Sequence, residues 1–211
     1  MPTTSTLALF AVAAFVLVVI PGPSVMYIMT RGISQGRQAA LVSVLGIQSG
    51  SVVHITAVAL GLSALLVSSA TAFNVVKYAG AAYLLVLGVR TLLGRDAAHA
   101  ARTLPPDGLR RIYAQGAVVN ILNPKTALFF LALFPQFIDP NRGNVLLQTA
   151  ALGLLFIVIG LLSDGTYAMA SGTIGAWLRQ RESFARAQRY LSGVVFIGLG
   201  VTAALAGRST K

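Results

Sequence analysis

The residues best suited to chemistry lie inside apolar stretches of the sequence. Pro21-Gly22-Pro23 removes two backbone N–H donors and adds a flexible glycine, so nearby carbonyl groups lose their helical partners. Asn123-Pro124 does the same in the second half of the chain. Such paired breaks are typical of substrate sites at the membrane midplane, where amides face a carboxylate and carbonyls face an ammonium. We predict substrate binding at both breaks and at the adjacent Lys125; a pair of packing kinks is the alternative.

Three ionisable residues lie in the same apolar stretches. Lys125 could hold a substrate carboxylate, pair with Asp164, or extend along its flexible stem to a nearby interface. Asp164 is the sole charge in its stretch, so it could carry a proton or bind an amino group; a neutral structural acid is the alternative. His54 could titrate, although a hydrogen bond between helices is the simpler role. We predict that Asp164 and His54 take part in proton coupling.

Several kinds of chemistry lack the residues that they need. The chain has no cysteine, which excludes disulfides, thiol redox relays, iron–sulfur clusters and thiolate metal sites. His54 has no neighbouring ligands in the sequence, so we predict no metal site and no cofactor. Phosphate-binding Gly-Lys-Ser/Thr loops and the HExxH and GxSxG motifs are absent. The sequence therefore predicts that the protein is not an enzyme, with an intramembrane enzyme or structural protein as the non-transport alternative.

The elements that position these residues are predicted to be membrane-spanning helices. The 211 residues are 56% hydrophobic and 10% charged, with a mean hydropathy of +0.79. An average soluble domain is roughly a quarter charged, so this composition excludes an ordinary soluble globule. We predict one all-α integral membrane domain over 1–211, with an uncleaved first span. Its six spans are expected within 1–30 (broken at 21–23), 39–67, 73–93, 112–138 (broken at 123–125), 145–177 and 190–206.

A weak internal similarity divides these spans into two halves. Lys77-Tyr78 aligns with Arg189-Tyr190, Ser51 aligns with Asp164, and the two proline breaks occur in corresponding order. We predict a first repeat over 1–93, a cytoplasmic loop over 94–111 and a second repeat over 112–211. Because three spans is an odd number, the second repeat would enter the membrane inverted, as in many secondary transporters. A chance likeness between apolar helices is the alternative.

The distribution of charge predicts the orientation and the partners. Most of the 16 Lys and Arg residues, including Arg31 and Arg37, fall in the first, third and fifth loops. Cytoplasmic loops are rich in these cations, so both termini are predicted to be periplasmic. The net charge of +11 then reflects topology and contact with the lipid bilayer, and we predict no nucleic-acid partner. Small residues at Gly46, Gly50, Gly80 and Gly88 favour close helix packing, and a homodimer is one use of such faces.

Several motifs recur in the order and spacing of one known family, and they cover the chain from about Phe10 to Val201. The chain resembles the LysE/RhtB family of bacterial amino-acid exporters. The motifs that carry the resemblance are Pro21-Gly22-Pro23, Gly36-Arg37, Gly46-Ile47 with Gly50, Lys77-Tyr78-Ala79-Gly80-Ala81-Ala82-Tyr83-Leu84 with Gly88, Asn120-Ile121-Leu122-Asn123-Pro124-Lys125, Phe134-Pro135-Gln136-Phe137 and Asp164.

The resemblance implies an inner-membrane transporter that moves amino acids outward and is driven by the proton gradient. Position 51 departs from the family pattern, because it is Ser where many members carry Asp or Asn. We predict export of small neutral amino acids such as leucine, threonine or homoserine, with protons as the coupling partner. A basic substrate would need a further acidic partner for its side chain. Export of basic amino acids, or of a metal or other cation, is the alternative.

Overall fold

The described part of the chain is helical. The computed structural model describes residues 1–68 and 107–171 continuously, without the side chains of 62–68, and single residues between 78 and 93 and between 190 and 201. Within these residues there is no strand. Most of the predicted third and sixth spans lies outside the described residues, as do the central loop over 94–106, Gly80 and Gly88.

The first helical pair is bent at the first proline break. Helix α1 (Thr4–Val19) and helix α2 (Pro23–Gln35) meet at an angle of 50°. Gly22 is the extended N-cap of α2, and Pro23 occupies its first position. Proline suits this position because its missing N–H would have no partner within the helix and its φ is already helical.

The second helical pair repeats this geometry at the second break. Helix α5 (Leu109–Ile121) is followed by α6 (Pro124–Leu128), the π-helical η1 (Phe129–Leu133) and the 3₁₀ helix η2 (Phe134–Phe137). The bend between the two parts is 48°. Asn123 caps α6, since its side chain accepts a hydrogen bond from Lys125 N, and Pro124 again occupies the first position.

Two longer helices complete the described part. Helix α3 (Arg37–Ser68) and helix α7 (Val145–Ala170) each contain a stretch long and apolar enough to cross a membrane. If each bent pair counts as one span, the described residues hold up to four spans. The chain is therefore a multi-pass membrane protein. A short 3₁₀ helix, η3 (Pro140–Arg142), lies in the connection before α7.

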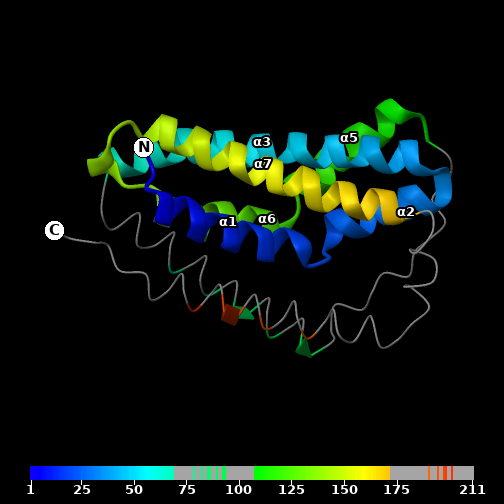
Figure 1. The fold of residues 1–211 in the computed structure, drawn as a ribbon, viewed down its shortest axis with the longest axis horizontal. Coiled ribbons are helices and arrows are strands. Elements are labelled where there is room, and N and C mark those ends of the chain that lie inside the picture. Colours follow the sequence, from blue (N-terminus) through cyan, green and yellow to red (C-terminus); the bar gives the residue numbers. More distant parts are fainter. Residues whose placement is uncertain are drawn as a thin grey trace.

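The helices run along one common direction (Figure 1). Helices α3 and α7 lie side by side over most of their length, α1 and α6 share one half of the molecule, and α2 and α5 share the other. The two bent pairs run in opposite directions, so their breaks meet near the middle. This arrangement places both proline motifs at the same level of the molecule.

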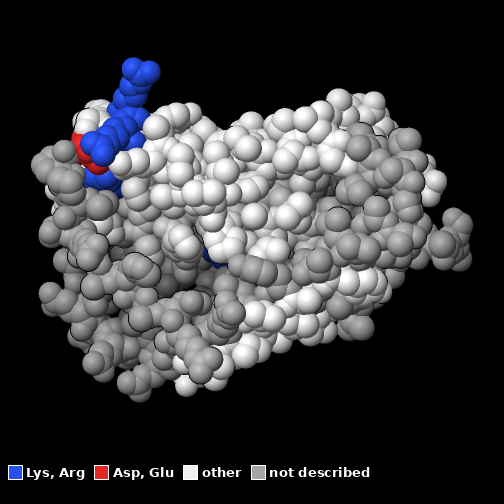
Figure 2. Space-filling view, turned by 180° about the vertical axis from the view of Figure 1, so that it is seen from behind, with Lys and Arg blue, Asp and Glu red and all other residues white. Residues whose placement is uncertain are grey.

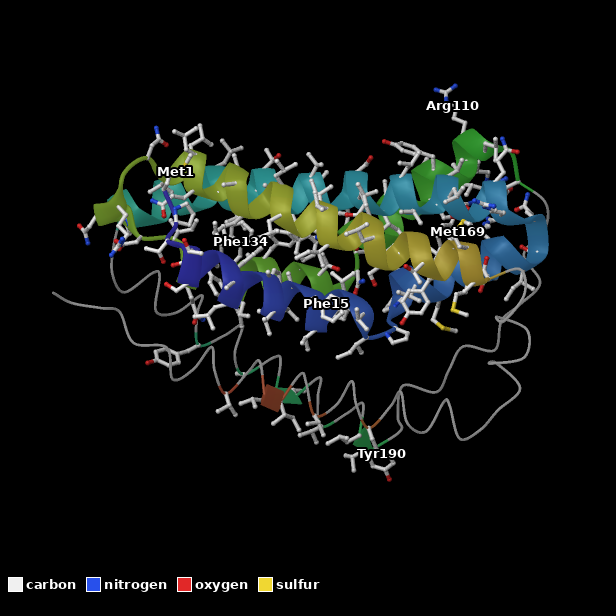
Figure 3. All side chains as sticks on the ribbon, in the orientation of Figure 1. Met1, Phe15, Arg110, Phe134, Met169 and Tyr190 are labelled. Carbon is white, nitrogen blue, oxygen red and sulfur yellow. The ribbon has the colours of Figure 1, made fainter. Side chains whose placement is uncertain are left out.

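A cluster of phenylalanines fills the half that holds α1 and α6. Phe10 packs edge-on against Phe134 and Phe137, at ring-centroid distances of 5.3 and 5.2 Å. Phe134 is fully buried and lies among the helices in Figure 3, whereas Phe15 points outward from α1 and is 56% exposed. Exposed apolar side chains such as Phe15 suit contact with lipid rather than water.

One group of basic side chains lies at the end of the molecule opposite Met1 and the Asp139–Arg142 ion pair (Figure 3). Figure 2 shows Lys and Arg side chains grouped at one end, with one small recessed blue area near the middle. Arg110 projects from this end (Figure 3), and α5 begins at Leu109, within the segment expected to be the loop. Arg110 and Arg111 therefore lie in the first helical turn, where long exposed side chains can reach lipid headgroups.

Arg31 is not a surface loop residue, because it lies within α2 and is 1% exposed. Its guanidinium pairs with Asp107 at 2.6 Å and donates to Gln35 and Gln115, also at 2.6 Å. Arg111 adds a second ion pair to Asp107 at 3.1 Å. A buried cation is stable only when it is paired and hydrogen-bonded. This cluster ties the end of α2 to the start of α5.

The Asp107 carboxyl makes stability depend on pH. The hydrogen bond from Arg31 holds the pKa of Asp107 below its ordinary value, opposed by desolvation and aided by the charge of Arg111. Because the folded-state pKa is the lower one, the ionised carboxyl stabilises the fold above its ordinary pKa, and this stabilisation is lost as the pH falls through the folded-state pKa. We expect the unfolding temperature to drop as the pH falls from about 5 to 3, and less steeply in Asp107→Asn.

Thermal unfolding in detergent at stepped pH tests this expectation. Asp139→Asn serves as the control for the loss of one carboxylate, because its ion pair with Arg142 is exposed. The control should keep the wild-type slope. Equal slopes in wild type and Asp107→Asn would show that this carboxyl does not contribute.

Candidate functional site

The first proline break frees backbone carbonyls that a cation then binds. In an unbroken helix, Leu17 O would accept from residue 21, but Pro21 has no N–H. Lys125 Nζ donates to Leu17 O at 2.8 Å and to Ile20 O at 2.7 Å. Lys125 is 6% exposed, so its ammonium does not extend to an interface. The second break therefore supplies the donor that the first break lacks.

Two other side chains replace N–H groups that prolines remove. Pro23 leaves Val19 O without its helical donor, and the Tyr167 hydroxyl donates to this oxygen at 2.7 Å. Pro124 likewise removes the helical donor of Asn120 O, which accepts from Asn123 N and from His54 Nε2–H, each at 3.1 Å. His54 thus makes the hydrogen bond between helices that was weighed as its simpler role, and its ring stacks on Phe130.

Gly22 leaves room for the lysine side chain. Its backbone is extended, so its conformation is one that any residue could adopt. A Cβ atom at position 22 would lie 3.3 Å from Lys125 Nζ and 3.4 Å from Cε. A larger residue at position 22 would therefore require the lysine side chain to shift by a few tenths of an ångström.

Asn120 joins the two breaks to α3. Its Oδ1 accepts from the hydroxyls of Ser24 and Thr126, each at 3.1 Å. Its Nδ2 donates to Ile47 O and to Ser51 Oγ, each at 2.9 Å. Asn123 Nδ2 also donates to Ser24 Oγ at 2.9 Å. All the polar capacity of the Asn120 amide is used, which fixes the geometry around the breaks.

Asp164 lies on α7 opposite Gln48 of α3. Gln48 Nε2 donates to Asp164 Oδ2 at 2.9 Å, and both side chains are buried. Gln48 Oε1 is buried without a hydrogen-bond partner among the described residues. Lys125 and Asp164 line the same cavity, but among the described ion pairs there is no direct one between them.

A small polar cavity lies between the breaks and α7, and its volume is about 30 Å³. That volume suffices for a water molecule, whereas small-molecule sites are typically about 300 Å³ or larger. The cavity as described is therefore too small for an amino acid. The described residues that line the cavity are Leu17, Val18, Ser24, Val25, Ile47, Gln48, Ser51, Asn120, Asn123, Lys125, Thr126, Phe156 and Asp164.

Some of the predicted site residues line the cavity, and others do not. Asn123, Lys125 and Asp164 line it, whereas Pro21 and Pro124 act through the carbonyls that they free. His54 lies behind the Asn120 hydrogen-bond network and is not among the described lining residues.

Sequence reasoning missed Gln48, Asn120 and Tyr167. The signal for Gln48 was its spacing, because Gln48, Ser51 and His54 recur every three residues and so share one face of a helix. Tyr167 likewise follows Asp164 by one turn of α7.

The arrangement can bind both charges of a small zwitterion. Freed carbonyls and a carboxylate are suited to an ammonium group, and a lysine is suited to a carboxylate. Among the described residues no group of three His, Asp or Glu side chains lies close enough to hold a metal ion.

Comparison with known proteins gives one family over most of the chain. Residues 15–207 match the LysE type translocator family. An uncharacterized membrane protein of Vibrio cholerae is 32% identical over 197 residues, which cover 93% of this chain and 95% of that protein. A homoserine/homoserine lactone efflux protein of Salmonella typhimurium is 35% identical over 75% of this chain and 77% of its own length. A leucine efflux protein of an Enterobacter species is 28% identical over 90% of each chain. No solved structure matches the chain.

Proposed function

Since the chain belongs to the family of LysE type translocators, we propose that it exports a small amino acid by alternating access around the two helix breaks. The observation that carries this proposal is the cavity between the breaks, which the buried ionisable side chains of Lys125 and Asp164 both line. Ionisable groups inside a membrane are costly and usually mark a transport pathway. The proposal gives the chain no catalytic step.

The names of the relatives support a substrate with a primary ammonium group. Homoserine, homoserine lactone and leucine each carry such a group, whereas the lactone has no carboxylate. A neutral side chain fits the cavity better than a basic one, because Asp164 is the one carboxylate among the described lining residues. The substrate is therefore a small neutral amino acid or its derivative.

Export is coupled to the entry of protons, and Asp164 is the residue that carries them. It lies within α7 at 3% exposure and faces Lys125 across a cavity large enough for water. A carboxyl in that position can exchange a proton with water when the site opens to either side. His54 has a supporting role, because it holds Asn120 in place.

The full architecture is an inverted repeat of three spans and three spans in the bacterial inner membrane. Bends of 50° and 48° at corresponding breaks support this arrangement, as do the opposite directions of the two pairs. The end that holds Arg110 and Arg111 faces the cytoplasm, which places both termini in the periplasm. The homodimer stays a prediction.

Counterflow in proteoliposomes tests the function. Vesicles preloaded with each of the twenty amino acids in turn would be followed for uptake of the same labelled amino acid, with and without a pH gradient. We expect saturable exchange of a few neutral amino acids and stimulation by the gradient. Dominant exchange of arginine or lysine would overturn the neutral substrate. No exchange by folded protein with any amino acid, homoserine or its lactone would overturn the proposal.

A further inference from the structure

The second break places a cation in a site that the first break forms. Leu17 O and Ile20 O lie at the end of α1, and Lys125 Nζ lies within 2.8 Å of both. A lysine Nζ is a primary ammonium on an alkyl stem, so its head group has the same donors as the amino group of an amino acid. The two carbonyls therefore hold a group that is chemically equivalent to part of the substrate.

Further acceptors lie around the same cavity. Asp164 is bonded to Gln48 through Oδ2, and its other carboxylate oxygen accepts no hydrogen bond from the described residues. Gln48 Oε1 is likewise buried without a partner in the described part. A buried acceptor such as Gln48 Oε1 is costly unless a donor binds it in some state of the protein. An incoming ammonium with three N–H donors would supply that donor.

We propose that the Lys125 ammonium is the resident occupant of an ammonium subsite formed by Leu17 O and Ile20 O, and that the substrate's amino group replaces it there. The displaced lysine then pairs with the carboxylate of the substrate. This inference rests on the proposed function for the identity of the substrate, but the subsite itself is defined by contacts within the chain.

The exchange keeps the charge of the site balanced. A zwitterion brings one positive and one negative charge; its ammonium takes the place of the lysine, and its carboxylate becomes the new partner of the lysine. No charge is left unpaired in a low-dielectric interior, where an isolated charge would be costly. In the absence of substrate the lysine fills the subsite, which accounts for the small cavity in this conformation.

The first test removes the resident ammonium and offers a free one. Purified Lys125→Ala would be heated in detergent with increasing propylammonium chloride. We expect a saturable rise in its unfolding temperature of roughly 2–5 °C, because a ligand that binds only the folded state stabilises it. Wild type should show no saturable rise, since its own lysine occupies the subsite. Propanol and tetramethylammonium, which lack an ammonium N–H, should leave Lys125→Ala unchanged.

Tyr167→Phe is the matched control. It removes the donor to Val19 O in the same break but leaves Lys125 on its two carbonyls. Propylammonium should not stabilise it. If folded Lys125→Ala gains no more from propylammonium than from propanol, the subsite does not bind ammonium, and Lys125 is only a structural cap. This result does not depend on whether the protein exports anything.

The second test uses wild-type protein and applies even if Lys125→Ala does not fold. Counterflow of leucine, or of the amino acid that exchanges fastest, would be measured with two inhibitors. Each inhibitor is a half-analogue, which keeps the side chain of the substrate but only one of its two charged groups. The amine without a carboxylate, isoamylamine for leucine, and the acid without an amine, 4-methylpentanoate, should each inhibit at least about tenfold more weakly than unlabelled leucine, because only the zwitterion both fills the subsite and pairs with the displaced lysine. Inhibition by either half-analogue as strong as that by leucine would overturn the exchange while leaving transport itself established.

Discussion

Asp164→Asn is expected to lower proton-driven export by about tenfold or more, equivalent to at least about 1.4 kcal/mol of the transport barrier. Asparagine keeps the shape of aspartate and can still accept the hydrogen bond from Gln48 Nε2, which is 2.9 Å from Asp164 Oδ2 in the wild type. It cannot take up or release a proton. The substitution therefore tests the charge of the residue separately from its packing at 3% exposure.

The measurement compares two modes of transport in the same proteoliposomes. Net export driven by a pH gradient requires proton exchange, whereas substrate-for-substrate counterflow at equal pH does not. We expect Asp164→Asn to lose the first mode and to retain a substantial part of the second. Asp139→Asn, which removes an exposed carboxyl, should behave as wild type. Gradient stimulation of wild-type size in Asp164→Asn from about pH 5 to 8 would assign proton coupling to another group.

Gly46→Ala is expected to cost about 1–3 kcal/mol of unfolding free energy, near the upper end of that range. Its new Cβ atom would overlap the carbonyl oxygen of Tyr113 and lie 3.2 Å from Ala117 N. Both are backbone atoms of α5, so no side chain can rotate away to relieve the clash. The helices α3 and α5 would have to move apart, and Asn120, which faces Gly50 of α3, would move with α5.

Gly61→Ala is the matched control in the same helix. Among the described residues, no atom beyond the adjoining turns of α3 lies within 4 Å of a Cβ built at Gly61. Alanine there should be neutral or should stabilise by up to about 1 kcal/mol, because glycine is the poorer helix former. Unfolding of both variants in detergent gives the comparison. A loss of stability of similar size at positions 46 and 61 would show that the tight crossing of α3 and α5 is not the cause.

The freed carbonyls could be identified from the sequence, but their partners could not. A proline removes the donor for the carbonyl four residues earlier, so Pro21, Pro23 and Pro124 point directly to Leu17, Val19 and Asn120. The side chains that bind these oxygens come from Lys125, Tyr167 and His54, up to 148 residues away. Their approach depends on how the bent pairs cross, which local spacing does not fix.

The positions of the apolar helices could also be predicted from the sequence, whereas the burial of Arg31 could not. The helical stretches around α3 and α7 were predictable, because long apolar runs in a membrane protein have few alternatives to a helix. Arg31 was assigned to a loop because cations usually lie outside the apolar core. It is buried within α2 because Asp107, distant in sequence, supplies the opposite charge. A pairing of that kind is a tertiary property, and one sequence gives no local sign of it.

The capping of the breaks is unequal between the two halves of the chain. Gly22-Pro23-Ser24 and Asn123-Pro124-Lys125 occupy the same cap positions, so Ser24 stands where the second half has its lysine. Ser24 Oγ bonds to the side-chain amides of Asn120 and Asn123 at the second break, and it brings no ammonium to the backbone carbonyls there. A protein built from two copies of the first half would have no lysine to bind the carbonyls of Leu17 and Ile20. If the halves descend from one duplicated ancestor, the lysine gave them different roles. The first break supplies the carbonyls and the second supplies the ammonium, so the halves are no longer interchangeable.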